Sequence, residues 1–178
     1  PFWATIKMSA ATTSVTSAKE LQQQMKEQMN LASFKVKNAA FDVILYEQNK
    51  RCQELGITFE KQVLYDDLSF LSYMDTCTIF ANALDNAVKA CSEIKEGERK
   101  IELFLKRKKD MLNIVIKNTK QNQILESNNR FFTTKSNKEH HGFGIENIKM
   151  AVEKYHGLVS IEYTEDSFVL AVIIPIPV

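Results

Sequence analysis

Hydrophobic positions recur along this chain at two spacings, one typical of amphipathic helices and one typical of half-buried strands. Helical spacing covers residues 18–35, 42–55, 76–94 and 144–156. Alternation of apolar and polar residues covers 57–63, 99–108, 111–117, 158–163 and 168–174. Paired strands with helices between them predict an α+β fold, a two-layer sandwich whose mixed, mainly antiparallel sheet is covered by helices on one face.

Turn and cap residues set the expected ends of these elements. Gly56 follows a helical stretch at a position where a left-handed residue commonly ends a helix, and Gly157 is expected to stop the last helix. Asp75 is expected to cap the longest helix. Residues 118–142 are poor in apolar side chains and are expected to form a long loop. Such a loop in a compact domain is usually functional or disordered.

The chain divides into three parts by composition. Residues 1–17 are expected to be a flexible lead-in or an expression remnant. Residues 18–37 are predicted to be a polar helix, and its narrow apolar stripe needs a partner helix. This helix is therefore a candidate tail of a dimerisation helix, through which a homodimer could form. Residues 38–178 are expected to form the main domain.

Composition excludes several classes of partner. The formal net charge is +1, from 23 basic and 22 acidic residues, which gives no reason to expect binding to nucleic acid or to a membrane. No apolar run approaches the roughly 20 residues of a membrane span, so any anchor of a membrane-bound parent protein would lie outside this segment. The three cysteines are widely spaced and are expected to be free thiols in a reducing, cytoplasmic environment.

Polar residues on the longest helix are the first candidates for chemistry. Asn82, Asn86 and Lys89 are spaced i, i+4 and i+7 and share one helix face. Two carboxamides and an ammonium on one face can hold a hydrated divalent cation and a chain of phosphates. The alternative is an ordinary solvated face, with Asp85 and Lys89 as an i, i+4 ion pair.

A second polar motif follows about fifty residues later. It comprises Thr133, Thr134 and Lys135, and then His141, Gly142, Phe143, Gly144 and Ile145. The Gly-x-Gly turn opens a helix, where backbone N–H groups point at anions. Together the two motifs predict a nucleotide held between a helix and a mobile loop.

In this order, the motifs resemble those of the GHKL (Bergerat-fold) ATP-binding domain shared by gyrase, heat-shock chaperones, histidine kinases and MutL. Asn-x-x-x-Asn at 82–86, Thr-Thr-Lys at 133–135 and His-Gly-Phe-Gly-Ile at 141–145 are most similar to the sensor histidine kinases of peptide quorum-sensing systems, the AgrC-type branch. The resemblance covers residues 39–175. Together, the motifs in this order indicate the family much more specifically than an isolated Gly-x-Gly would.

The resemblance implies a role for each polar residue of the helix. Asn86 matches the asparagine whose side-chain oxygen coordinates magnesium, and a carboxamide oxygen suits that hard cation. Asn82 would contact phosphate or a metal-bound water, and Lys89 would supply positive charge near the phosphates.

The resemblance also assigns the loop that follows. Thr133, Thr134 and Lys135 match lid positions that close over the phosphates. His141 matches a loop histidine that contacts phosphate or the lid and is not the phosphorylated residue. The nucleotide-binding set is completed by Gly142, Phe143, Gly144 and Ile145, at the start of a helix whose dipole favours phosphate.

The family's adenine-binding motif, Asp-x-Gly-x-Gly, is altered in this chain. The matching segment is Asn118-Thr119-Lys120-Gln121-Asn122, which contains no glycine. The carbonyl of Asn118 can still accept from the adenine amine while its NH2 donates to the ring nitrogen. Alternatively, Asn118 only forms a turn at the end of a strand.

By resemblance, the chain is the ATP-binding catalytic domain of a two-component sensor histidine kinase that uses ATP and Mg²⁺. Family members that hydrolyse ATP carry a glutamate general base at the position of Asn82, which cannot accept a proton. Transfer of the γ-phosphoryl group is therefore favoured, and no side chain is assigned a catalytic role. The acceptor would be a histidine on a dimerisation helix outside this chain, with a response regulator as the next partner. The chain itself should bind ATP without phosphorylating itself.

Two other functions remain open. One is a serine kinase of the anti-sigma-factor type, which typically carries an acidic residue at the Asn82 position. The other is a non-catalytic nucleotide-binding or dimerisation module, which the missing glycines after Asn118 make credible.

Overall fold

The structure is a computed structural model that describes residues 38–121, 124–127, 130–133 and 143–177. The predicted lead-in and dimerisation helix, residues 1–17 and 18–37, lie outside the described residues. No helix among the described residues is both long enough and apolar enough to span a membrane.

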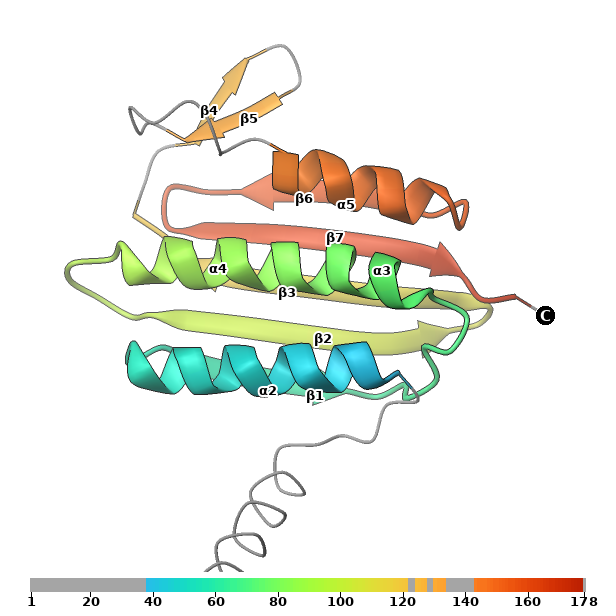
Figure 1. The fold of residues 1–178 in the computed structure, drawn as a ribbon. Helices are drawn as coiled ribbons and strands as arrows, with labels where there is room; N and C mark the ends of the chain where they lie inside the picture. Colours follow the sequence, from blue (N-terminus) through green and yellow to red (C-terminus); the bar gives the residue numbers. More distant parts are fainter. Residues whose placement is uncertain (1–37, 122–123, 128–129, 134–142, 178) are drawn as a thin grey trace, which may run out of the picture. The chain divides into compact units, whose positions relative to one another are not determined.

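A five-stranded sheet forms one layer, in the order β1-β2-β3-β7-β6 (Figure 1). Its strands are β1 Thr58–Val63, β2 Lys100–Lys108, β3 Met111–Thr119, β6 Leu158–Tyr163 and β7 Ser167–Pro175. Strand β1 runs parallel to β2, and the other neighbours are antiparallel. The predicted mixed, mainly antiparallel sheet is therefore confirmed.

Helices cover one face of this sheet (Figure 1). They are α2 Ala39–Glu54, α3 Tyr73–Thr76, the π-helical segment η1 Cys77–Ala81, α4 Asn82–Ser92 and α5 Phe143–Glu153. Alternate strand residues turn their side chains toward the helices because successive side chains of a strand point to opposite faces. On the three central strands these core residues are Ile101, Leu103, Leu105, Leu112, Ile114, Ile116, Leu170, Val172 and Ile174. The predicted two-layer arrangement is confirmed.

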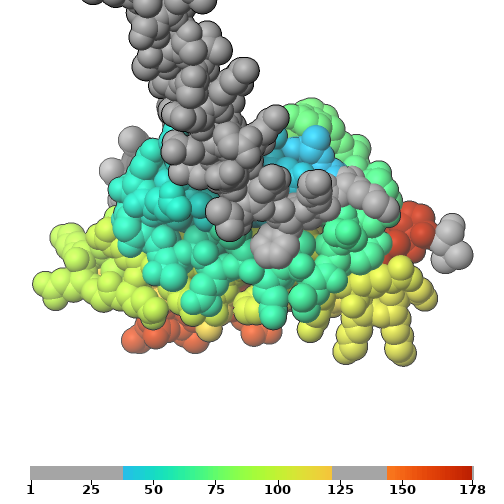
Figure 2. Space-filling model, turned by 90° about the horizontal axis from the view of Figure 1, so that it is seen from below, coloured from blue at the N-terminus to red at the C-terminus, as the bar shows by residue number. Residues whose placement is uncertain are grey.

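Helix α2 begins and ends at well-defined caps. The side chain of Asn38 accepts hydrogen bonds from the backbone N–H groups of Ala40 and Phe41, at 3.1 and 3.3 Å. Gly56 has a φ of 63°, the left-handed conformation predicted for it. The buried side of the helix packs on the core through Phe41, Leu45 and Cys52. Seen from below, α2 runs along the near side of the molecule (Figure 2).

The long helix starts three residues earlier than predicted. Ser72, not Asp75, is the N-cap: its hydroxyl accepts the backbone N–H of Asp75 at 3.1 Å. Segments α3, η1 and α4 follow without a break, from Tyr73 to Ser92. The sequence is ambiguous here because both residues are good N-cap types, although Ser-x-x-Asp is itself a capping signature with the serine first.

The predicted loop 118–142 contains more strand than expected. Strand β3 continues through Thr119, and β4 Ile124–Ser127 pairs with β5 Arg130–Thr133 as a separate two-stranded sheet. Each of these two strands has only four residues, which is too short for a clear alternating pattern. The hairpin lies near the beginning of α5 (Figure 1).

The end of α5 also differs from the prediction. The residue in the left-handed conformation is His156, with a φ of 56°, and not Gly157. Gly157 is needed for another reason, since a Cβ there would lie 2.6 Å from Cγ1 of Val152 and 2.7 Å from the carbonyl oxygen of Ile173. The glycine thus allows the chain leaving α5 to pack directly on strand β7.

Candidate functional site

The π-helical segment η1 orients the first of the two predicted asparagines. The backbone N–H of Asn82 bonds to the carbonyl of Ile79, and its side-chain Nδ2 donates to the carbonyl of Thr78 at 2.7 Å. A carbonyl oxygen can only accept, so the nitrogen of the Asn82 amide faces Thr78 and Oδ1 faces the other way. Short π-helical segments occur frequently at functional sites.

Gly144, near the start of α5, lies against both asparagines. A Cβ at this glycine would be 3.3 Å from Nδ2 of Asn86 and 3.8 Å from Oδ1 of Asn82. The predicted helix face and the predicted Gly-x-Gly turn therefore meet, although they are about sixty residues apart in sequence. A larger residue at position 144 would crowd the Asn86 amide.

This meeting places several polar groups together. Oδ1 of Asn82 and the exposed side chain of Asn86 lie beside the first turn of α5. The first backbone N–H groups of an α-helix have no partner within the helix, and the helix dipole makes its start favourable for anions. The arrangement places the Asn82 amide oxygen and the Asn86 amide, whose nitrogen is the atom nearest Gly144, beside N–H donors for phosphate oxygens. Ile145, the next residue of α5, is half-buried.

The remaining polar residues of α4 have different surroundings. Asp85 accepts hydrogen bonds from Gln48 at 2.8 Å and from Arg51 at 2.9 Å, so its carboxylate braces α4 against α2. Lys89 is half-buried on α4, one turn beyond Asn86. The side chain of Asp85 thus has partners on α2, and the alternative ion pair with Lys89 stays a prediction.

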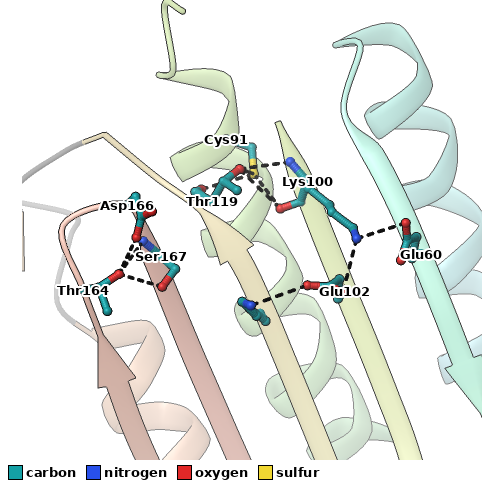
Figure 3. Close-up of polar contacts among 9 residues, drawn as sticks. Glu60, Cys91, Lys100, Glu102, Thr119, Thr164, Asp166 and Ser167 are labelled. Atoms are coloured by element: carbon teal, nitrogen blue, oxygen red, sulfur yellow. Dashed lines mark hydrogen bonds and ion pairs between the residues drawn. The ribbon is translucent and has the colours of Figure 1, made fainter. Parts of the chain in front are cut away.

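Asn118 lies at the end of strand β3, on the face of the sheet that the helices cover. The residue is only 3% exposed, and its Nδ2 donates to the carbonyl of Thr119 at 2.9 Å. The thiol of Cys91, near the end of α4, lies 3.4 Å from the same carbonyl (Figure 3). The helix that carries Asn82 and Asn86 thus also reaches the strand end that carries Asn118.

The cysteines are free thiols, as predicted. Burial raises the pKa of Cys52 to about 11, with a further increase from nearby Cys91. Burial likewise raises the pKa of Cys91, against the lowering effect of its hydrogen bonds to Thr119 and Lys100. Both thiols stay protonated near neutral pH and have the character of core residues, not of nucleophiles.

Part of the predicted site lies outside the described residues, namely Thr134, Lys135, His141 and Gly142. Thr133 ends strand β5 and Phe143 begins α5, and only their backbone is described. The predicted lid contacts of these residues remain predictions.

A polar cluster at the far end of α5 was not predicted. Asp75, which is 6% exposed, accepts hydrogen bonds from the Ser72 hydroxyl at 2.6 Å, from Lys154 at 2.6 Å and from the Tyr155 hydroxyl at 2.7 Å. The backbone N–H of Ser72 in turn donates to the Tyr155 hydroxyl at 2.9 Å. The cluster joins the start of α3 to the end of α5, at the opposite end of α5 from Gly144. Its only sequence signal was the Ser-x-x-Asp cap.

Comparison with known proteins agrees with this geometry. Residues 71–175 match the family model described as the GHKL domain. These residues contain the long helix with both asparagines, Asn118 and all of α5. The chain therefore belongs to the GHKL domain family. Among curated proteins, none matches the chain.

Solved structures share the fold. The catalytic domain of the histidine kinase ThkA, in a nucleotide-free form, is 18% identical with a TM-score of 0.59, over 76% of this chain and 90% of that one. The mycobacterial sensor histidine kinase MprB is 17% identical with a TM-score of 0.58, over 78% and 95% of the two chains. The Acinetobacter baumannii histidine kinase AdeS is 12% identical with a TM-score of 0.56, over 79% and 64%.

Proposed function

We propose that this chain is the ATP-binding catalytic domain of a two-component sensor histidine kinase. It would bind Mg²⁺-ATP and transfer the γ-phosphoryl group to a histidine outside this chain. The single observation that carries the proposal is the approach of Gly144 to Asn82 and Asn86. Family membership and the shared fold of histidine kinase catalytic domains support it.

The residues fit a magnesium nucleotide. Oδ1 of Asn82 is turned away from Thr78, and the space beside Asn86 is one that a Cβ at residue 144 would fill. A neutral carboxamide is a weak ligand by itself, so we infer that Asn86 holds the metal jointly with the phosphates. When bound, Mg²⁺ would neutralise charge on the triphosphate.

Helix α4 would align the two ends of the nucleotide. From Asn82 to Cys91 the helix rises roughly 13 Å, at 1.5 Å per residue. Asn82 and Asn86 would face the phosphates, while Cys91 contacts the strand end where Asn118 would meet the base. In Figure 1 the start of α5, the end of α4 and the end of β3 lie toward the same end of the molecule.

Phosphoryl transfer, not hydrolysis, is the reaction we propose. Catalysis of phosphoryl transfer depends mainly on positioning and charge neutralisation, which the amides and the helix start could supply. The side chain of Asn82 stands where a hydrolytic enzyme of this family needs a base, and an amide cannot accept a proton. We further propose, from the motifs at 82–86, 133–135 and 141–145, that the kinase is of the peptide quorum-sensing type, with a response regulator as the downstream partner.

Nucleotide binding by the full chain tests this proposal. We expect calorimetry to show magnesium-dependent binding of ATP, and Asn86→Ala to weaken it about 10- to 100-fold, because the metal loses its protein ligand. Asn113→Ala is the matched control: Asn113 lies on the other face of the sheet, where its side chain bonds to the Met111 carbonyl at 3.2 Å. This control should bind ATP like the wild type. Equal binding by wild type and Asn86→Ala, with or without magnesium, would contradict the proposed site.

A further inference from the structure

The first four of the five residues that match the glycine-rich adenine motif are each fixed by a hydrogen bond. Asn118, Thr119, Lys120 and Gln121 leave strand β3 toward the β4–β5 hairpin. In a glycine-rich segment the backbone would be conformationally free. Here side chains tie the segment to three other parts of the fold.

Thr119 ties the segment to strand β2. Its hydroxyl accepts the backbone N–H of Lys100 at 2.9 Å, and its carbonyl lies 3.4 Å from the buried thiol of Cys91 (Figure 3). This threonine therefore links the end of β3 to the start of β2 and to the end of α4.

Lys120 ties the segment to the turn between β6 and β7. The residue is only 5% exposed, and its ammonium donates to the carbonyl of Glu165 at 2.9 Å. The backbone N–H of Lys120 donates to the carbonyl of Asp166 at 2.8 Å. Hydrogen bonds among Thr164, Asp166 and Ser167 close that turn (Figure 3). The residue at the position of the motif's first glycine is thus a buried cross-link.

Gln121 ties the segment to the connection between α4 and β2. Its Nε2 donates to the carbonyl of Glu96 at 2.7 Å, and its Oε1 accepts the backbone N–H of Lys95 at 3.0 Å. Both ends of the amide are used, so its orientation is fixed.

These ties fix the carbonyl that orients Asn118. Because the Thr119 carbonyl can only accept, the Asn118 amide must present its nitrogen there, at 2.9 Å. The reversed amide would place two oxygens against each other and lose the hydrogen bond. Within the described part of the chain, no hydrogen bond to Oδ1 of Asn118 is found. The oxygen is thus the end of the amide that remains for a ligand.

We propose that Thr119, Lys120 and Gln121 are positioning residues that lock the Asn118 amide in one orientation. This lock makes the site select a base with an amine over a base with a carbonyl at the same position. The inference rests on the proposed nucleotide-binding function. Adenine carries such an amine, whereas guanine and hypoxanthine carry an oxygen there. An oxygen facing Oδ1 would leave two buried acceptors opposed, without a proton between them.

The first measurement compares ATP with inosine triphosphate, which replaces the adenine amine by a carbonyl oxygen. We expect the full chain to bind the magnesium complex of ATP about 10- to 100-fold more tightly than that of inosine triphosphate. Equal affinities would overturn the inference and leave the proposed function intact. Failure to bind either nucleotide would overturn both.

Asn118→Asp gives the sharpest second test. It restores the acidic residue of the family motif, so the motif alone predicts unchanged or tighter ATP binding. The lock predicts the opposite, because a carboxylate oxygen would then face the Thr119 carbonyl oxygen. We expect ATP binding to weaken by about tenfold or more. ATP binding as tight as in the wild type would overturn the inference.

Thr119→Val tests positioning as distinct from structural support. We expect the ATP-to-inosine triphosphate affinity ratio to fall several-fold, while binding of magnesium tripolyphosphate, which has no base, stays unchanged. Thr119→Ser keeps the hydroxyl and should keep the ratio. Thr58→Val, on the exposed first residue of β1, is the matched control. An unchanged ratio in Thr119→Val, or an equal loss for all three ligands, would show that Thr119 has no positioning role.

Discussion

The cluster around Asp75 shows how one buried carboxylate can position two helices. Three donors from Ser72, Lys154 and Tyr155 converge on its two oxygens. Burial by itself would raise the pKa of Asp75, but the hydrogen bonds from Lys154, Ser72 and Tyr155 outweigh it and lower that pKa. The ionised form is therefore favoured in the folded protein.

Asp75→Asn should lower the free energy of unfolding by about 1–3 kcal/mol at pH 7, because an amide must place its NH2 against one of the donors. The ion pair with Lys154 contributes little to this free energy, since that side chain is 62% exposed. Because folding lowers the pKa of Asp75, its ionised carboxylate stabilises the fold at pH values above the ordinary aspartate pKa of about 3.9. This stabilisation is lost as the pH falls through the lower pKa of the folded state. Wild type and variant should therefore converge in stability at low pH.

Urea unfolding at pH 7 and at successive steps below pH 4 measures this difference. Asp66→Asn, at an exposed position before α3, should change stability by less than about 0.5 kcal/mol and serves as the control. A difference between wild type and Asp75→Asn that stays constant down to pH 2 would disprove the ionic role of Asp75.

Among the helices and strands, the packing of α5 against the long helix assembles the candidate site. The two helices meet at both ends, through Gly144 beside Asn86 and through Tyr155 beside Asp75. The two helices pack closely at Gly144, since a Cβ there would lie 3.3 Å from Nδ2 of Asn86. Stability and ligand binding should therefore respond differently to a change at this position.

Gly144→Ala should leave the free energy of unfolding unchanged or raise it by up to about 1 kcal/mol, because alanine favours a helix over glycine. Binding of Mg²⁺-ATP should weaken on the order of tenfold, because the new methyl group displaces the Asn86 amide. Thermal unfolding without ligand and calorimetry with ligand separate the two effects. Unchanged ATP affinity would show that the close contact does not matter for binding.

For the whole molecule, the fold separates its one described histidine from the proposed phosphate end. His156 is exposed just beyond the end of α5, whereas Gly144 lies at the beginning. The helix between them rises roughly 13 Å over its nine steps from Gly144 to Glu153. His140 and His141 lie outside the described residues. The proposed acceptor is a histidine outside this chain.

The full chain, incubated with magnesium and γ-labelled ATP, should therefore bind nucleotide but acquire no label. Gel autoradiography under conditions that preserve phosphohistidine, run beside a calorimetric binding measurement, makes the check. Label on the chain would contradict the assignment, and loss of that label in His141→Gln or His156→Gln would identify the acceptor.

Much of the fold could be predicted from local patterns. The alternation at 99–108 and 111–117 located strands β2 and β3, and the 3.6-residue period located α4 and α5. Failures occurred where local signals were short or ambiguous. Local patterns do not reveal the four-residue strands β4 and β5, and they favour Asp75 as the cap although Ser72 is the cap. The pattern predicts Gly157 as a helix stop because sequence cannot show its close packing on strand β7.

Sequence by itself determined which chemical groups the site has: two amides one helical turn apart, a glycine at a helix start and an asparagine at a strand end. These follow from residue type and spacing, which depend on backbone period alone. Tertiary structure decided that Gly144 touches Asn86, that Asp75 joins α3 to α5, and that Lys120 is buried beneath the β6–β7 turn. Each of these contacts joins residues that are distant in sequence, so only the packing of the elements can create it.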